Sequence, residues 1–138
     1  MDLRNTLMGT LGIEIVEASK GKVVATMPVD QRTHQPMGLL HGGASVALAE
    51  TVASLGGLLL VDEEKETVVG LEINANHLKG KRDGVVTATG NVLHKGKKTM
   101  VWEIKIADEE NELICISRCT LAVIQIKKEK EDASVGLS

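Results

Sequence analysis

The feature that most constrains this chain is an apolar stretch from Gly42 to Val61 that contains a single charged residue, Glu50. Its length alone would admit a membrane-spanning helix. Glu50 near its middle and the Gly56-Gly57 pair that follows both argue against that interpretation. A helix buried inside the protein explains the stretch better. The rest of the chain must then supply the layer that covers this helix.

The segments on either side of this stretch alternate apolar and polar residues, as β-strands do. Residues 12–18 and 22–29 are expected to form a hairpin, and four further strands are expected around residues 69–75, 85–93, 99–106 and 113–124. In the first of these four, the residues expected on one face are Val69, Leu71, Ile73 and Ala75. A short helix is expected at residues 2–10, and the charged tail 127–138 is expected to fray.

The order strand, strand, long helix and four strands predicts an α+β fold, in which an antiparallel sheet packs against one helix. The chain has 138 residues, which fits one domain with an ordinary hydrophobic core, so residues 1–138 are interpreted as a single domain.

Composition excludes several functions. Trp102 is the only aromatic residue, and the net charge is −3 with a pI near 5.8, so neither base stacking nor general polyanion binding is indicated. Cys115 and Cys119 lack a second pair of cysteines or histidines at zinc-ligand spacing, which favours buried free thiols over a metal site. The first residues carry no signal-peptide pattern. We therefore expect a cytoplasmic protein with no metal, no nucleic acid partner and no membrane partner.

Glu50 is the first candidate for chemistry, because a carboxylate in an apolar helix is costly unless it has a partner or a task. Ser54 lies one turn later on the same face and could hydrogen-bond the carboxylate or a water beside it. The alternative is structural: Glu50 reaches solvent or a partner at a subunit interface, and Ser54 is an ordinary small helical residue.

A second candidate group lies at the predicted start of the helix. There, His41-Gly42-Gly43 would present unpaired backbone N–H groups and the positive end of the helix dipole to a developing oxyanion. Gln35, six residues earlier, could donate an amide hydrogen bond to the same oxygen. A glycine-containing loop before a helix is also common structure without any catalytic role.

Gly42 and Glu50 are eight residues apart, which places them roughly 12 Å apart along one helix. They cannot act together on one carbonyl group within a single chain. If both take part in catalysis, the site combines Gly42 of one subunit with Glu50 of another, as two antiparallel helices in a twofold dimer would allow.

Residues 34–54, HQPMGLLHGGASVALAETVAS, resemble the signature segment of hot-dog-fold thioesterases, in the branch that hydrolyses hydroxyaryl acyl-CoA or acyl-carrier thioesters. The strand order, the chain length and residues 68–79, VVGLEINANHLK, are also similar to that family. The resemblance covers roughly residues 8–125. It implies a sheet wrapped around the central helix, dimers joined edge to edge, and dimers that commonly pair into tetramers.

The resemblance also implies a role for each candidate. The general base or nucleophile falls on Glu50, the oxyanion amide on Gly42, the carbonyl-orienting glutamine on Gln35, and the water-positioning hydroxyl on Ser54. His41 matches the histidine that precedes the oxyanion amide. No cofactor is expected, because coenzyme A is part of the substrate.

The family passes pantetheine between subunits along the strand after the helix. The residues that this implies for the substrate tunnel or acyl pocket are Val69, Gly70, Leu71 and His77. Basic residues suited to the nucleotide phosphates are Lys81, Arg82, Lys95, Lys97 and Lys98, with Gly96 allowing close backbone approach. Ordinary core packing and solvated turns are the alternative explanations.

Two other functions fit the same fold. A hot-dog dehydratase or hydratase also acts on thioesters, although Gln35 and the His-Gly-Gly helix start favour hydrolysis. A noncatalytic acyl-CoA-binding protein would leave Glu50 without a chemical task. The acyl group is not determined by the sequence, and the resemblance favours hydroxylated aromatic groups, including 1,4-dihydroxy-2-naphthoyl-CoA.

Overall fold

The computed structural model describes residues 2–126 of the chain. In chain order these residues form α1 (Leu7–Leu11), β1 (Glu14–Ser19), β2 (Lys22–Pro28), α2 (Gly42–Leu58), β3 (Glu66–His77), β4 (Val85–Lys95), β5 (Thr99–Ala107) and β6 (Leu113–Gln125). This is the order expected from the sequence. The tail that was predicted to fray lies outside the described residues.

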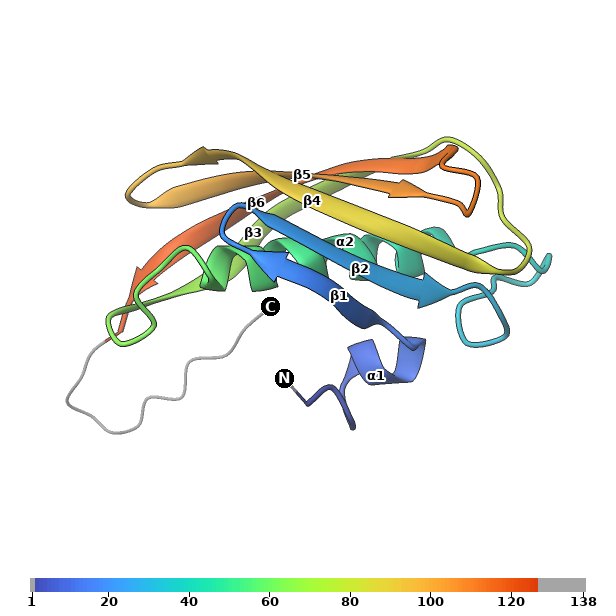
Figure 1. Cartoon of the computed structure of the whole chain (residues 1–138), viewed down its shortest axis with the longest axis horizontal. Coiled ribbons are helices and arrows are strands. Elements are labelled where there is room, and N and C mark those ends of the chain that lie inside the picture. Colours follow the sequence, from blue (N-terminus) through green and yellow to red (C-terminus); the bar gives the residue numbers. More distant parts are fainter. Residues whose placement is uncertain (1, 127–138) are drawn as a thin grey trace.

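The strands form one antiparallel sheet in the order β1-β2-β4-β5-β6-β3. After α2 the chain passes to the far side of the sheet, where β3 pairs with β6, so β1 and β3 are the two edges. Figure 1 shows the sheet arching over α2, with α1 below the β1 edge. The predicted α+β architecture of a sheet around one long helix is confirmed.

Small residues allow α2 to lie close to the sheet. Its buried residues are Ala44, Ser45, Leu48, Ala49, Val52, Ala53, Ser54, Gly56 and Gly57. A Cβ atom on Gly56 would lie 2.3 Å from the ring of the fully buried Trp102, and one on Gly57 would lie 2.5 Å from Leu121 Cδ1. The C-terminal end of α2, which contains Gly56 and Gly57, therefore lies directly against the largest side chain of the core.

The predicted common face of Val69, Leu71, Ile73 and Ala75 is wrong. Between Gly70 and Glu72 the pairing of β3 with β6 shifts by one residue, so Leu71 is an extra residue in a β-bulge and its side chain is 59% exposed. Before the bulge, Val68 faces the core; after it, Ile73 and Ala75 do. The bulge thus moves the alternation by one position within a single strand.

Both helices are shorter than expected. Thr6 caps α1 by accepting a hydrogen bond from the Gly9 N–H, and Gly12 ends it at φ 77°, so the residues before Thr6 are not helical. The long helix ends at Leu58 rather than near Val61. Cys115 and Cys119 are free and buried, as predicted.

We predict that Gly56→Ala destabilises the protein. Overpacking against Trp102 should cost about 1–3 kcal/mol, which exceeds the gain of about 1 kcal/mol from replacing a helical glycine. Denaturant unfolding measures the net change. Ala47→Gly, on the opposite face of α2, is the matched control for helix propensity alone. An unchanged or higher unfolding midpoint for Gly56→Ala would contradict the packing described here.

Candidate active site

Residues 29–41, here called the glutamine loop, connect β2 to α2 and carry Gln35. The loop is fixed from within by Thr33, which is 2% exposed and donates its hydroxyl to the Pro28 carbonyl at 2.9 Å. Gln35 sits in a tight turn in which its N–H donates to the Leu39 carbonyl at 2.8 Å and its side-chain Oε1 accepts from the Met37 N–H. With Oε1 engaged, the Nε2 amide is the part of Gln35 that can donate to a substrate oxygen.

The glutamine loop ends at His41, which is the N-cap of α2. Its Nδ1 accepts a hydrogen bond of 2.7 Å from the Gly43 N–H, so Nε2 carries the proton of the neutral ring. Gly42 begins the helix, and its N–H comes before the first hydrogen bond of the helix, in which the Ala44 N–H donates to the His41 carbonyl at 3.0 Å. His41 thus shapes the helix start that presents Gly42.

His77 at the end of β3 packs against this helix start. A Cβ atom on Gly42 would lie 2.9 Å from His77 Nε2, so only glycine allows this contact. Gln35, Gly42 and His77 line one hollow of about 350 Å³ together with Leu39, Leu40, Ser45, Leu78, Lys79, Gly80 and Ile114. The structure therefore brings together Gln35, Gly42 and His77 from three separate segments.

Glu50 lines a different hollow, with a volume of about 520 Å³. The carboxylate is half-buried, and Ser54 lies one turn further along the same face, as the sequence predicted. The remaining lining is largely apolar and comes from α1, β1 and the face of α2 that points away from the sheet: Leu7, Met8, Ile15, Gly43, Val46, Ala47, Thr51, Leu55 and Leu58. Sequence reasoning missed Leu7 and Met8, whose only signal was an apolar pair in a short helix.

The negative charge of Glu50 affects a cysteine thiol inside the core. Burial, together with the negative charges of Glu50 and Glu72, raises the pKa of the Cys119 thiol to about 12. Cys119 lies on β6 opposite Ile73 of β3.

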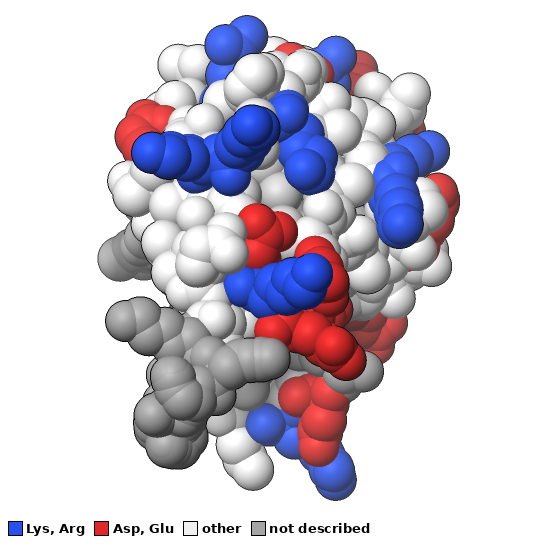
Figure 2. All heavy atoms as spheres, turned by 90° about the vertical axis from the view of Figure 1, so that its left-hand side faces the viewer, with Lys and Arg blue, Asp and Glu red and all other residues white. Residues whose placement is uncertain are grey.

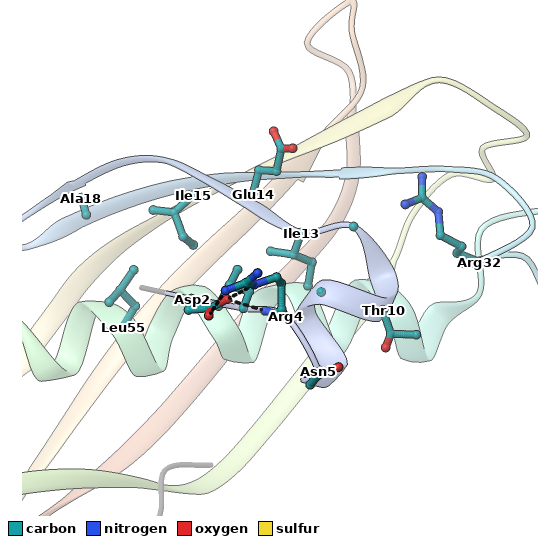
Figure 3. A pocket seen from close by; sticks show the side chains of 13 residues that line it. Asp2, Arg4, Asn5, Thr10, Ile13, Glu14, Ile15, Ala18, Arg32 and Leu55 are labelled. Atoms are coloured by element: carbon teal, nitrogen blue, oxygen red, sulfur yellow. Dashed lines mark hydrogen bonds and ion pairs between the residues drawn. The ribbon is translucent and has the colours of Figure 1, made fainter.

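A third, open hollow of about 1360 Å³ lies between residues 2–5, α1 and β1. Figure 3 shows that Arg4 turns back to Asp2, with which it forms an ion pair at 2.9 Å, while Ile15 and Leu55 point inward. Ile15 and Leu55 line both this groove and the Glu50 hollow, so the two adjoin. The groove contains none of the residues predicted to act in catalysis.

Known proteins share this sequence pattern and this fold. The sequence profile of the Thioesterase superfamily matches residues 37–115, which include the helix start, Glu50 and Ser54. The chain belongs to the thioesterase superfamily. It is a thioester hydrolase with the hot-dog fold.

Three relatives illustrate the similarity. A 1,4-dihydroxy-2-naphthoyl-CoA hydrolase of Listeria monocytogenes is 55% identical over 122 residues, covering 88% of this chain and 98% of its own. The structure of a Haemophilus influenzae thioesterase superposes with a TM-score of 0.88 at 50% identity, covering 94% of this chain and 90% of its own. A glutamine-to-alanine variant of a Staphylococcus aureus thioesterase superposes with a TM-score of 0.83 at 46% identity, covering 86% and 98%.

The two hollows of this thioesterase are not one site within a single chain. Gly42 lines the first and Glu50 the second, and the helix between them spans roughly 12 Å. Four of the predicted catalytic residues line a hollow and His41 lines neither; Gln35 and Gly42 lie beside one hollow, and Glu50 and Ser54 beside the other.

The basic residues predicted for the nucleotide lie at two ends of the thioesterase. Arg82 precedes β4, whereas Lys95, Gly96, Lys97 and Lys98 form the turn after it, so about 33 Å of strand separates them. Figure 2 views the end of the molecule that carries this turn, where Lys and Arg side chains gather in a band above mixed acidic and basic residues. One protomer alone cannot place both groups on a single nucleotide.

Two further properties concern residues 2–126. No group of three or more His, Cys, Asp or Glu side chains in this part of the chain is arranged to hold a metal ion. No helix in the same range combines the length and the apolar character that crossing a membrane requires.

We predict that His41→Asn preserves the stability of this thioesterase better than His41→Ala. Asn can replace the ring nitrogen as a helix cap, whereas Ala leaves the Gly43 N–H without it, at a cost of about 1 kcal/mol. Thermal and denaturant unfolding of the two variants measure the difference. Equal midpoints would show that the cap does not stabilise α2.

Proposed function

We propose that this thioesterase hydrolyses acyl-CoA thioesters that carry a hydroxylated aromatic acyl group, at a site shared by two protomers of a dimer. The observation that carries this proposal is the division of the catalytic residues between two hollows. Gln35 and Gly42 line one, and Glu50 lines the other, although both sets belong to the pattern that the sequence predicted for one site.

Several features support a shared site. The Glu50 face of α2 is open except where α1 covers it, and β3 is a 12-residue edge strand with Leu71 exposed. Long uncovered edges of this kind favour pairing with another strand. Antiparallel packing of two α2 helices would place Gly42 of one protomer beside Glu50 of the partner subunit. Two dimers pairing into a tetramer is a further expectation of the family resemblance.

The choice of Gln35 and Glu50 has independent support from the Staphylococcus aureus thioesterase. Structures of that protein were solved with a glutamine replaced by alanine and with a glutamate fifteen positions later replaced by alanine. Gln35 and Glu50 have the same separation, 50 − 35 = 15. The equal separation supports Gln35 and Glu50 as the corresponding pair in this chain.

The proposed reaction uses these groups in sequence. The Gln35 amide and the Gly42 N–H donate to the thioester oxygen and stabilise the negative charge that develops on it, aided by the positive end of the α2 dipole. Glu50 of the partner subunit either takes a proton from water as that water attacks the carbonyl carbon, or attacks the carbon itself to form an anhydride that water then cleaves. The C–S bond breaks, and the released thiolate takes up a proton. Ser54 positions the water beside the carboxylate.

The acyl group is proposed from the shape of the Glu50 hollow and from a relative. The hollow is apolar and about 520 Å³, a size within the range of small-molecule pockets. The Listeria relative is named for hydrolysis of 1,4-dihydroxy-2-naphthoyl-CoA, a bicyclic hydroxyaryl thioester. Leu7, Met8 and Leu55 would contact the ring.

The coenzyme A portion would follow β3, past Val69, Gly70 and His77, toward basic residues at the surface. The phosphates would meet Lys95, Lys97 and Lys98 of one protomer, beside Gly96, and Arg82 of the partner subunit, because these groups are too far apart in one chain. A substrate of this kind implies a cytoplasmic enzyme.

We predict that two inactive variants restore each other. Glu50→Gln and Gln35→Ala should each lower turnover, the former by about 10²- to 10⁴-fold. When they are unfolded together and refolded as a mixture, each mixed dimer regains one site with both groups intact, giving about a quarter of wild-type activity. Thiol release from 4-hydroxybenzoyl-CoA measures this. No recovery in confirmed mixed dimers would mean that the site lies within one chain.

We also predict a preference among acyl groups. Across a panel of CoA thioesters, hydroxylated aryl groups such as 4-hydroxybenzoyl and 1,4-dihydroxy-2-naphthoyl should give a higher kcat/KM than straight-chain acyl groups of similar size, because the hollow suits a flat apolar ring. Thiol release is followed in parallel with absorbance of an α,β-unsaturated acyl-CoA. A change at the double bond without thiol release would favour a dehydratase or hydratase instead.

A further inference from the structure

The glutamine loop is held from outside by residues 78–84, here called the backing segment, which joins β3 to β4. Three of its carbonyl groups accept hydrogen bonds of 2.8 Å from the loop: Lys81 from the Leu40 N–H, Arg82 from His34 Nε2, and Gly84 from the Val29 N–H. These contacts are spread over the beginning, middle and end of the loop. The position of Gln35 therefore depends on where the backing segment lies.

The backing segment has no regular secondary structure, and side chains of the β5–β6 connection hold it in place. This connection, residues 108–112, is here called the acidic turn. Lys81 Nζ pairs with Glu109 Oε1 at 2.6 Å, and Lys79 pairs with Glu112 and, at 3.6 Å, with Asp108. Lys81 is 16% exposed and Asp108 only 7%, whereas their partners Glu109 and Lys79 are 49% and 48% exposed, so each of these two pairs joins a shielded side chain to one at the surface.

Glu109 makes the most specific of these contacts. Its second oxygen, Oε2, accepts from the Val85 N–H at 2.8 Å, so one carboxylate joins the side chain of Lys81 to the start of β4. Gly84 lies between them at φ 87°, and a Cβ atom there would lie 1.9 Å from Glu109 Oε2. The backing segment is thus shaped to receive this carboxylate.

The acidic turn is itself rigid. Asp108 Oδ1 accepts from the Glu110 N–H at 2.9 Å and from the Glu112 N–H at 2.8 Å, which closes the turn around one carboxylate. The hydrogen bonds from Lys81 and the Val85 N–H lower the pKa of Glu109 to about 2, so this carboxylate remains ionised at neutral pH. A fixed turn therefore presents a permanent charge to the backing segment.

We propose that Glu109 and Lys81 are positioning residues for Gln35: the acidic turn fixes the backing segment, and the backing segment fixes the glutamine loop that carries Gln35. Neither residue lines the hollow beside Gln35, so neither contacts the substrate there. Both act through the glutamine loop. The proposal rests on the proposed function, in which Gln35 and Gly42 bind the thioester oxygen.

A double-mutant cycle between Glu109→Gln and Gln35→Ala tests this proposal. Glutamine keeps the size of Glu109 and an acceptor for the Val85 N–H but removes the charge that holds Lys81. In the wild-type background we expect kcat for 4-hydroxybenzoyl-CoA to fall about 10-fold with little change in KM, since a small displacement of catalytic donors is costly. In the Gln35→Ala background the same change should have an effect of less than about 2-fold, because the group that it positions is absent.

Two controls separate positioning from loss of structure. Glu17→Gln removes the carboxylate of another surface ion pair, with Lys22 at 3.9 Å, and should leave kcat unchanged. Lys81→Arg keeps the charge and should retain most of the activity that Lys81→Met loses. Unfolding midpoints of all variants confirm that each is folded at the assay temperature.

The possible outcomes are distinct. Equal fold-losses from Glu109→Gln in both backgrounds, or a lower unfolding midpoint with unchanged kcat, would overturn the positioning role. If Gln35→Ala itself leaves turnover unchanged, the proposed function fails at its own step. If Gln35→Ala is impaired but Glu109→Gln is not, the proposed function stands and the role of the acidic turn is refuted.

Discussion

The close contact between α2 and the sheet is the constraint on which the rest of this structure depends. Gly56 lies against the Trp102 ring, and on the sheet side Gly90 makes room for Val52, because a Cβ atom there would lie 2.4 Å from Val52 Cγ1. Trp102 Nε1 is buried without a hydrogen-bond partner among the described residues, a cost of about 1–3 kcal/mol. Trp102 is nevertheless needed to fill the core, because the chain has no Phe or Tyr. Because one face of α2 is fully used by this packing, Glu50 emerges on the other.

Because α2 is packed tightly against the sheet, the distance between two positions along it is fixed. The donors at its start and the carboxylate near its middle are fixed roughly 12 Å apart, and no side-chain rotation brings Glu50 to the oxygen bound at Gly42. Catalytic groups require positioning to well under 1 Å, which rigid elements provide better than loops do. A second copy of the same helix is the simplest way to bring both groups to one carbonyl. The proposed dimer is thus a consequence of the packing that makes one protomer stable.

The sequence was sufficient for the order of elements, the interior helix and the buried thiols. Periodicity and the interrupted apolar run determine these features locally. The face predicted for Leu71 was wrong because of a bulge, and two other strands contain bulges of the same kind. Register shifts in β1, β3 and β4 leave Val16, Leu71 and Leu93 as extra residues that are 62%, 59% and 50% exposed. A bulge inserts one residue without any change in composition, so alternation alone does not reveal it.

Contacts between distant segments were equally hidden. His77 meets Gly42 only because β3 pairs with β6 at the edge of the sheet, a placement set by the whole fold rather than by either segment. From the sequence alone, the acidic turn resembles an ordinary solvated connection between two strands. Its carboxylates can hold the backing segment only because the fold places that segment beside them. This placement depends on the same strand order.

The two halves of the candidate site are therefore held by different physical interactions. Packing of α2 against the sheet fixes Glu50, and such packing is little affected by salt. Hydrogen bonds and partly exposed ion pairs fix Gln35, and screening weakens ion pairs according to their exposure. The carboxylate belongs to the core and the amide donor to a polar framework at one end of the sheet. A change in the core should disturb the first without the second, and a change in the acidic turn should do the reverse.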